Sequence, residues 1–202
     1  MNDNDKTVST AEKKHPIREY FQCFKLDTRS IATNSIIAAM YVALTYAFFF
    51  TSYGTPQVRV SELLMILAFF NPNYTIGLTI GCLLANIYSP AFGLTPLDMV
   101  FGTLATFLAC VLESLCRHML IASIMPAITN AFIIAYELTF LSNLDFGGLS
   151  TSVFYWTNFG WIFLGEIIAV SIIGYILFFV LLKKSPGFGR VINAKRNLQF
   201  KW

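Results

Sequence analysis

The chain carries few charged residues for its length. Only 12% of its 202 residues are Asp, Glu, Lys or Arg, whereas 56% belong to the hydrophobic set. Soluble domains carry about 25% charged residues, and the mean hydropathy of this chain is +0.63. Too few ionisable side chains are present to cover a surface that faces water, so we expect a lipid bilayer around most of the chain. The soluble enzyme and nucleic-acid-binding classes are excluded first.

Motifs for catalysis, metal binding and nucleotide hydrolysis are also missing. The four cysteines form no CxxC pair and the two histidines stand alone, so the ligand spacings of zinc sites are absent. The sequence contains no HExxH, no GxSxG and no GxxxxGK[ST] phosphate loop. We therefore expect a non-catalytic protein without a metal or prosthetic group. A membrane enzyme remains an alternative that lacks a catalytic constellation.

Six apolar runs follow one another, separated by short polar or Gly/Pro-containing breaks. They cover residues 31–50, 58–70, 74–88, 97–116, 119–141 and 157–182. The second and third are shorter than the ~20 residues that a straight crossing needs, so they are tilted partners in a bundle or one of them re-enters. The Asn71-Pro72-Asn73 break between them predicts a tight turn. The predicted fold is an all-α integral membrane protein, a compact bundle of six transmembrane helices.

Basic residues gather on one side of such a bundle. Six precede the first run, Arg117 lies between the fourth and fifth, and six follow the sixth, which accounts for 13 of the 14 Lys and Arg residues. The positive-inside rule makes that side cytoplasmic, so both termini are expected in the cytoplasm. The predicted parts are a basic arm (1–30), a membrane domain (31–182) and a basic tail (183–202). The outer connections are then 51–57, 89–96 and 142–156.

Acidic residues interrupt the apolar runs, where exposure to lipid costs about 2.5–3.5 kcal/mol on insertion scales. Glu62, Asp98 and Glu137 fall in the outer half of their helices, near Arg59 in height, whereas Glu113 and Glu166 are harder to place. Arg59 and Glu62 are three residues apart and can pair on one helix face. Two interpretations stay open: an ion pair that only holds helices together, and an outward cavity in which Arg59 and the three outer acids bind a ligand.

Neutral polar and aromatic residues extend this candidate site. Asn86, Asn130 and Asn158 place amides at apolar depths, where each is either interhelical glue or a ligand contact. The outer connections hold Tyr53 and a Phe-Tyr-Trp run that ends at Trp156. These aromatics form either an interfacial belt or a mobile lid over the cavity mouth.

Small residues recur every four positions in the first run, at Ala39, Ala43 and Ala47. Such a ladder leaves a shallow groove that lets another helix approach closely. Packing inside the bundle and docking of a separate membrane protein both remain open.

Three separated motifs carry a resemblance to a known family. They are Gln57-Val58-Arg59-Val60-Ser61-Glu62, the segment GLTIGCLLAN at 77–86 and the segment LDMVFGTLAT at 97–106. In these motifs, at Asn130 and at the Gly165-Glu166 pair, the sequence resembles the queuosine-precursor transporter family. The resemblance runs over roughly residues 30 to 184.

The resemblance implies a substrate-binding S component of an energy-coupling factor (ECF) transporter of the ABC type, located in the plasma membrane. Such a protein captures a vitamin or related micronutrient outside. It then docks on a transmembrane coupling protein and two cytoplasmic ATPases, which use the ATP, and is thought to topple to release its cargo. The resemblance also implies that the alanine ladder is the docking surface and that the first and third outer connections are gates.

The resemblance leaves two substrates nearly level. The family name implies a deazapurine base, whose ring donors and cationic aminomethyl group suit the carboxylates of Glu62, Asp98 and Glu137. Relatives similar to this group are associated with cobalamin, a corrinoid. The 16% aromatic content of the chain and the Asn residues of the expected cavity favour the corrinoid slightly. The alternative function is a self-contained, proton-coupled secondary transporter of a small organic solute, with one of these acids as its relay.

Overall fold

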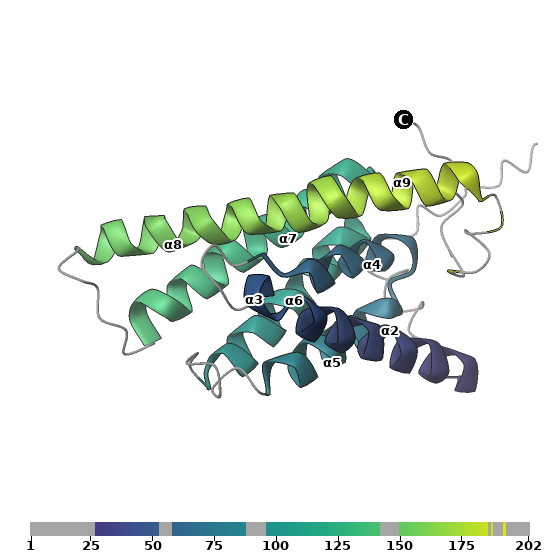
Figure 1. The fold of residues 1–202 in the computed structure, drawn as a ribbon, viewed down its shortest axis with the longest axis horizontal. Coiled ribbons are helices and arrows are strands. Elements are labelled where there is room, and N and C mark those ends of the chain that lie inside the picture. Colours follow the sequence, from purple (N-terminus) through teal and green to yellow (C-terminus); the bar gives the residue numbers. More distant parts are fainter. Residues whose placement is uncertain are drawn as a thin grey trace, which may run out of the picture.

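The computed structural model describes residues 27–52, 58–87, 96–141, 150–185, 187 and 192. All regular structure in these ranges is helical, which confirms the all-α prediction. The order is α2 (Thr28–Ala47) with α3 (Phe49–Ser52), η1 (Val60–Met65) with α4 (Ile66–Phe70), α5 (Tyr74–Asn86), α6 (Asp98–Leu115), α7 (Met119–Tyr136) with η3 (Glu137–Leu141), and α8 (Thr151–Glu166) with η4 (Ile167–Gly174) and α9 (Tyr175–Lys184) (Figure 1). The η1 helix is 3-10, whereas η3 and η4 are π-helical.

Four helices in the described ranges are long and apolar enough to cross a membrane. They are Thr28–Ala47, Asp98–Leu115, Met119–Leu141 and Thr151–Lys184. Two apolar helices, Val60–Phe70 and Tyr74–Asn86, are shorter. At 1.5 Å per residue the 13-residue α5 reaches about 20 Å, less than the ~30 Å of a hydrocarbon core. The prediction of six crossings with cytoplasmic termini therefore stays a prediction.

The break between the two short helices is the tight turn that its sequence predicts. The N–H of Tyr74 donates to the carbonyl of Asn71 at 3.0 Å, and the N–H of Asn73 donates to the Asn71 side chain at 3.2 Å. The second bond is typical of Asn in turns, because the Asn side chain can accept a hydrogen bond from the backbone two residues on.

The last helix begins earlier than the sequence predicted. Helix α8 starts at Thr151, so the Phe-Tyr-Trp run at 154–156 lies in its first turns and not in an outer connection. Aromatic rings then continue along one face, with Tyr155 on Phe159 at 6.4 Å and Phe159 on Phe163 at 5.9 Å between centroids. Side chains four apart on a helix are neighbours, and their contact stabilises the helix. These stacked pairs therefore favour a helix that begins before residue 157.

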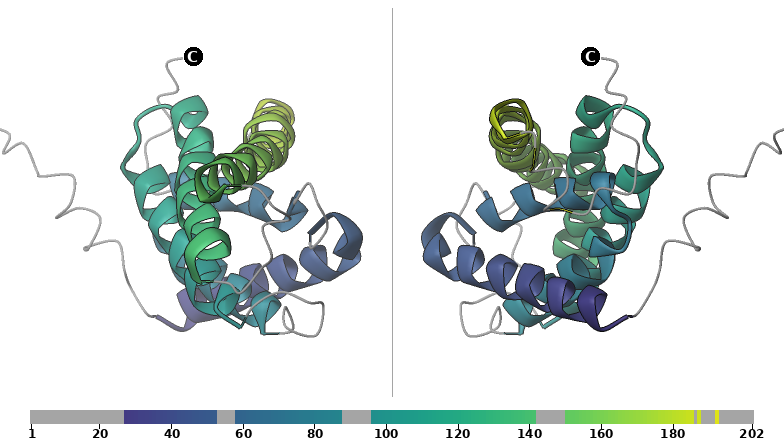
Figure 2. Two further views of the ribbon diagram at one scale, coloured as in Figure 1. Left: turned by 90° about the vertical axis from the view of Figure 1, so that its left-hand side faces the viewer. Right: turned by 90° about the vertical axis from the view of Figure 1, so that its right-hand side faces the viewer.

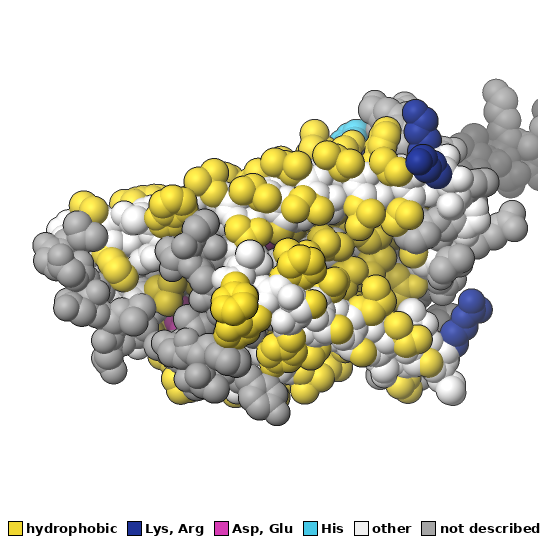
Figure 3. All heavy atoms as spheres, in the orientation of Figure 1, with side chains coloured by type: hydrophobic (Ala, Val, Ile, Leu, Met, Phe, Trp, Pro, Cys, Tyr) yellow, Lys and Arg dark blue, Asp and Glu magenta, His cyan; other side chains and the backbone are white. Residues whose placement is uncertain are grey.

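Exposed basic side chains mark one end of the bundle. Arg29 lies near the start of α2, Arg117 in the α6–α7 connection, and Lys183 and Lys184 at the end of α9. The start of α2 and the end of α9 lie at the same end of the molecule (Figure 1). Figure 3 shows Lys and Arg only at that end of the visible face, and hydrophobic side chains along its length. This arrangement fits the predicted gathering of positive charge on one side.

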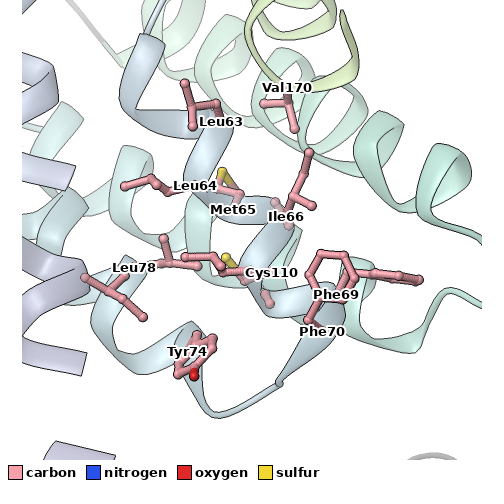
Figure 4. Close-up of a cluster of buried hydrophobic side chains, with 14 of the residues drawn as sticks. Leu63, Leu64, Met65, Ile66, Phe69, Phe70, Tyr74, Leu78, Cys110 and Val170 are labelled. Atoms are coloured by element: carbon pink, nitrogen blue, oxygen red, sulfur yellow. The ribbon is translucent and has the colours of Figure 1, made fainter. Parts of the chain in front are cut away.

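The core surrounds the short segment formed by η1 and α4. Every residue from 61 to 70 is buried, and this segment passes between the α8–η4–α9 helix and α2 (Figure 2). Its side chains pack with Leu78 of α5, Cys110 of α6 and Val170 of η4 (Figure 4). A helix that is apolar on nearly all sides is stable only when other helices cover it. Its place in the centre follows from that.

Two glycines bring α5 close to α2. A Cβ on Gly77 would lie 2.6 Å from the carbonyl oxygen of Asn34, and one on Gly81 would lie 2.8 Å from the Cβ of Tyr41. The N–H of Gly77 donates to the Asn34 side chain at 2.8 Å. Glycines four residues apart permit this backbone approach between membrane helices. The contact holds Tyr41 against the centre of the bundle.

We therefore expect Gly81→Ala to destabilise the protein by about 1–3 kcal/mol, because the added methyl group overlaps Tyr41 and the Ala38 backbone. Thermal unfolding of the detergent-solubilised protein measures the effect. Gly160→Ala is the matched control, since no heavy atom lies within 4 Å of the Cβ position there. A Gly81→Ala protein as stable as wild type would contradict the close approach.

Candidate functional site

A cavity lies where η1, α6, α7 and α8 meet. Its volume is about 340 Å³, counting the space at its open mouth. The described residues of its wall are four ionisable side chains, one amide, two isoleucines and a glycine: Arg59, Glu62, Asp98, Asn130, Glu166, Ile134, Ile162 and Gly102. Ligand pockets are usually apolar with a small number of polar groups. This one is polar for its size, and it lies inside a bundle whose surface is apolar.

Arg59 is the central cation of the site. Its Nη1 lies 3.5 Å from Oε1 of Glu62, and its Nη2 lies 3.9 Å from Oδ2 of Asp98. The predicted Arg59–Glu62 pair is thus confirmed. Its geometry differs from the expected α-helical face: Arg59 is extended just before η1, and the 3-10 turn places Glu62 above it. Side chains three apart eclipse in a 3-10 helix, which brings the two charges together.

Asn130, in the middle of α7, joins two carboxyl groups. Its Nδ2 donates to Oε2 of Glu62 at 3.0 Å and to Oε1 of Glu166 at 2.5 Å. An amide nitrogen carries two hydrogens, so both are used. Oδ1 of Asn130 and Oε2 of Glu166 are buried and accept no hydrogen bond from the described residues. These atoms leave acceptors on this wall of the cavity.

A second layer of polar groups supports the wall. The Tyr41 hydroxyl donates to Oε1 of Glu62 at 3.4 Å. The Cys82 thiol accepts from Thr106 at 3.2 Å and from Asn86 at 3.5 Å, and Asn86 also donates to the carbonyl of Asp98 at 3.4 Å. Asn86 therefore stands behind the cavity wall and positions the first turn of α6. Cys82, Cys110 and Cys116 are free thiols.

The structure brings together four of the residues that the sequence singled out. Arg59, Glu62, Asp98 and Asn130 line one cavity. Their contacts run from η1 to α6 and α7, so the four side chains form one connected polar cluster. A role for this cluster in ligand binding stays a prediction.

Other predicted residues do not line the cavity. Glu137 is fully buried at the start of η3, and the Asn158 amide donates to the Phe154 carbonyl one turn earlier at 3.0 Å. Trp156 is 60% exposed, outside the cavity wall. Tyr53 lies outside the described residues, as do most of the expected outer connections. A role for these four in binding stays a prediction.

Glu166 lines the cavity but was not among the binding residues that the sequence predicted. It ends α8 and lies near the middle of the continuous helix from Thr151 to Lys184. A helix expected to start at 157 gave no reason to set this acid beside Glu62. The resemblance did include the Gly165-Glu166 pair together with Asn130, and these are the two positions that meet. Glu113 is buried outside the cavity, in α6.

The chain is similar to known transporters. A family described as "QueT transporter" matches residues 31–183. A curated protein of Lactococcus lactis subsp. cremoris (strain MG1363), named "Queuosine precursor transporter QueT", is 44% identical over 84 residues, 41% of this chain and 47% of that relative. The match thus spans about half the length of that protein. No solved structure matches significantly. Because the family match covers most of the chain and every helix of the bundle, the chain belongs to the QueT transporter family.

Proposed function

We propose that this membrane protein binds a queuosine precursor, a deazapurine base, and delivers it as the S component of an ECF-type importer. The observation that carries the proposal is the cavity in which Arg59, Asn130 and three carboxyl groups face one small volume. Membership of the QueT transporter family supports transport as the role of that cavity.

The donor and acceptor pattern of the cavity suits such a base. Deazapurines of this kind present ring N–H and amino donors and can carry a cationic aminomethyl group. Carboxylates accept paired N–H donors, and hydrogen bonds are stronger when one partner is charged. The unpaired acceptors Asn130 Oδ1 and Glu166 Oε2 are the atoms that such donors would reach.

The cavity does not support the corrinoid that the sequence placed slightly ahead. That preference assumed an aromatic, Asn-bearing cavity, whereas the described residues of the wall include four ionisable side chains and no aromatic one. The cavity is small, since its ~340 Å³ already counts the space at its open mouth. A corrinoid with its amide arms needs more room and more neutral hydrogen-bonding groups.

The outer face of α2 supports docking to a separate coupling protein. Ala39, Ala43 and Ala47 are all exposed, while the buried residues of the helix are Asn34, Ile37, Ala38, Tyr41 and Thr45. The alanine ladder is therefore not used for packing against the described part of the bundle. A chain without a phosphate loop also needs ATPases from elsewhere. We propose one transmembrane coupling protein and two cytoplasmic ATPases as partners.

A self-contained proton-coupled carrier is the second candidate, because buried carboxyl groups at membrane depth can act as proton relays. Mass spectrometry of the small molecule that copurifies with the chain would name the cargo under either hypothesis.

We expect proteoliposomes that contain this chain alone to bind the deazapurine base but not to concentrate it, with or without a pH gradient. The physical reason is that binding by itself supplies no net work. Radiolabelled uptake measures accumulation, and adding the coupling protein with its ATPases and ATP should start it. Concentrative uptake by the isolated chain under a pH gradient would support the carrier instead.

We expect Ala39→Leu and Ala43→Leu to block ATP-driven uptake while ligand affinity changes little. A larger side chain fills the groove that a partner helix would enter. Affinity by calorimetry and uptake with the full complex are measured side by side. Thr157→Leu, at an exposed position of α8, is the control for added apolar surface. Normal uptake by both alanine variants would remove the ladder from the docking surface.

Substitutions of the Arg59–Glu62 pair test whether the pair binds the ligand or only holds helices together. Arg59→Ala leaves Glu62 buried without its cation, so we expect ligand binding to weaken. The double variant Arg59→Met with Glu62→Leu removes both charges, and apolar exchange of a purely structural pair often costs little. Calorimetric titration of the folded double variant decides. Lost binding places the pair in the site, and unchanged affinity makes it scaffold.

A further inference from the structure

The charges around the cavity do not balance. Glu62, Asp98 and Glu166 place three carboxyl groups in its wall, and Arg59 is the one cation there among the described residues. That guanidinium lies within 4.0 Å of Glu62 and of Asp98. Glu166 has no ion pair with a described cation. Among the described residues, it accepts a hydrogen bond from Asn130 at 2.5 Å and lies against the Glu62 carboxyl group.

The surroundings of Glu166 leave it facing the cavity with free acceptor capacity. The residue is 7% exposed, and its Oε2 accepts no hydrogen bond within the described part of the chain. Oδ1 of Asn130, which is 4% exposed, is likewise without a donor. A buried carboxylate without a counter-charge is strongly unfavourable. The site is therefore incomplete on this wall unless something positive or a proton arrives there.

We propose that Glu166 is the counter-ion for a cationic group of the ligand, with Oδ1 of Asn130 accepting a second hydrogen from the same group or the adjoining ring edge. The ion pairs of Arg59 are to Glu62 and Asp98, so Glu166 has only the longer-range attraction of that guanidinium. The ligand class is a flat heteroaromatic base with a primary ammonium or amidinium group. This assignment rests on the proposed function. It makes Glu166 the residue that selects charged over neutral precursors.

The competing account is a proton shared between Glu166 and Glu62. Both carboxyl groups bond the same Asn130 amide, and each would then need no cation from the ligand. The two accounts differ in one respect: a shared proton makes the site indifferent to the charge of the ligand, whereas a counter-ion does not.

The test uses the full chain in detergent at neutral pH and two deazapurine bases with the same ring. One carries an aminomethyl arm, which is a cation, and the other a nitrile arm, which is neutral. We expect wild type to bind the cation at least about tenfold more tightly, in line with hydrogen bonds to charged groups. Glu166→Gln keeps the shape of the side chain but removes its charge. This variant should bind the cationic base more weakly and the neutral base unchanged, so that the preference vanishes.

Glu113→Gln is the matched control, because Glu113 is another fully buried acid that lies outside the cavity wall. It should keep the preference of wild type. Equal binding of both bases by wild type, or an equal loss of both in a folded Glu166→Gln protein, would overturn the assignment in favour of the shared proton.

A second ligand series separates this inference from the proposed function. Thermal unfolding is measured with arylmethylamines and the matching neutral arylmethanols. If neither deazapurine binds wild type, the proposed function is wrong. Stabilisation by the amines in wild type but not in Glu166→Gln would still uphold the counter-ion, whereas no stabilisation by either series would overturn it as well.

Discussion

A guanidinium buried in an apolar bundle is the constraint on which the rest of the site depends. Arg59 is 7% exposed, and an unpaired charge at such a place costs several kcal/mol. Its pairs with Glu62 and Asp98 tie η1 to the start of α6. Glu62 in turn accepts from Tyr41 of α2 and from Asn130 of α7, and Asn130 reaches Glu166 of α8. A single network of polar contacts therefore holds five elements in place around one cavity.

The irregular helices adjoin this set of contacts. Glu62 lies in the 3-10 helix η1, and Glu166 directly precedes the eight-residue π-helix η4. The two helices pack closely: a Cβ on Gly174 would lie 2.9 Å from Cδ1 of Ile66 and 3.3 Å from the Cβ of Leu63. Local departures from α-helical geometry frequently mark functional sites, since they re-aim side chains. Here they turn two acids toward the same amide.

Helix α2 has two faces with different chemistry. Its inner face supplies Tyr41 to Glu62 and meets the glycines of α5, while its outer face presents Ala39, Ala43 and Ala47 to the surroundings. In the proposed importer the same helix would meet the coupling protein and contact the binding site. The docking surface and the binding site would then be close together, because the two faces of α2 are only half a helical turn apart.

Composition and spacing by themselves determined the class of this protein, because lipid selects apolar runs of a given length and a buried charge must find a partner. An all-helical bundle, one-sided basic charge, a tight turn at Asn71 and the Arg59–Glu62 pair all follow from those local rules. Only the tertiary structure decided which polar groups meet. Asn130 and Glu166 are 36 residues apart, and neither the start of α8 at Thr151 nor the rotation of each helix is encoded in hydropathy. Packing around the central η1–α4 segment sets those rotations, and they bring Glu166 into the cavity and leave Trp156 outside its wall.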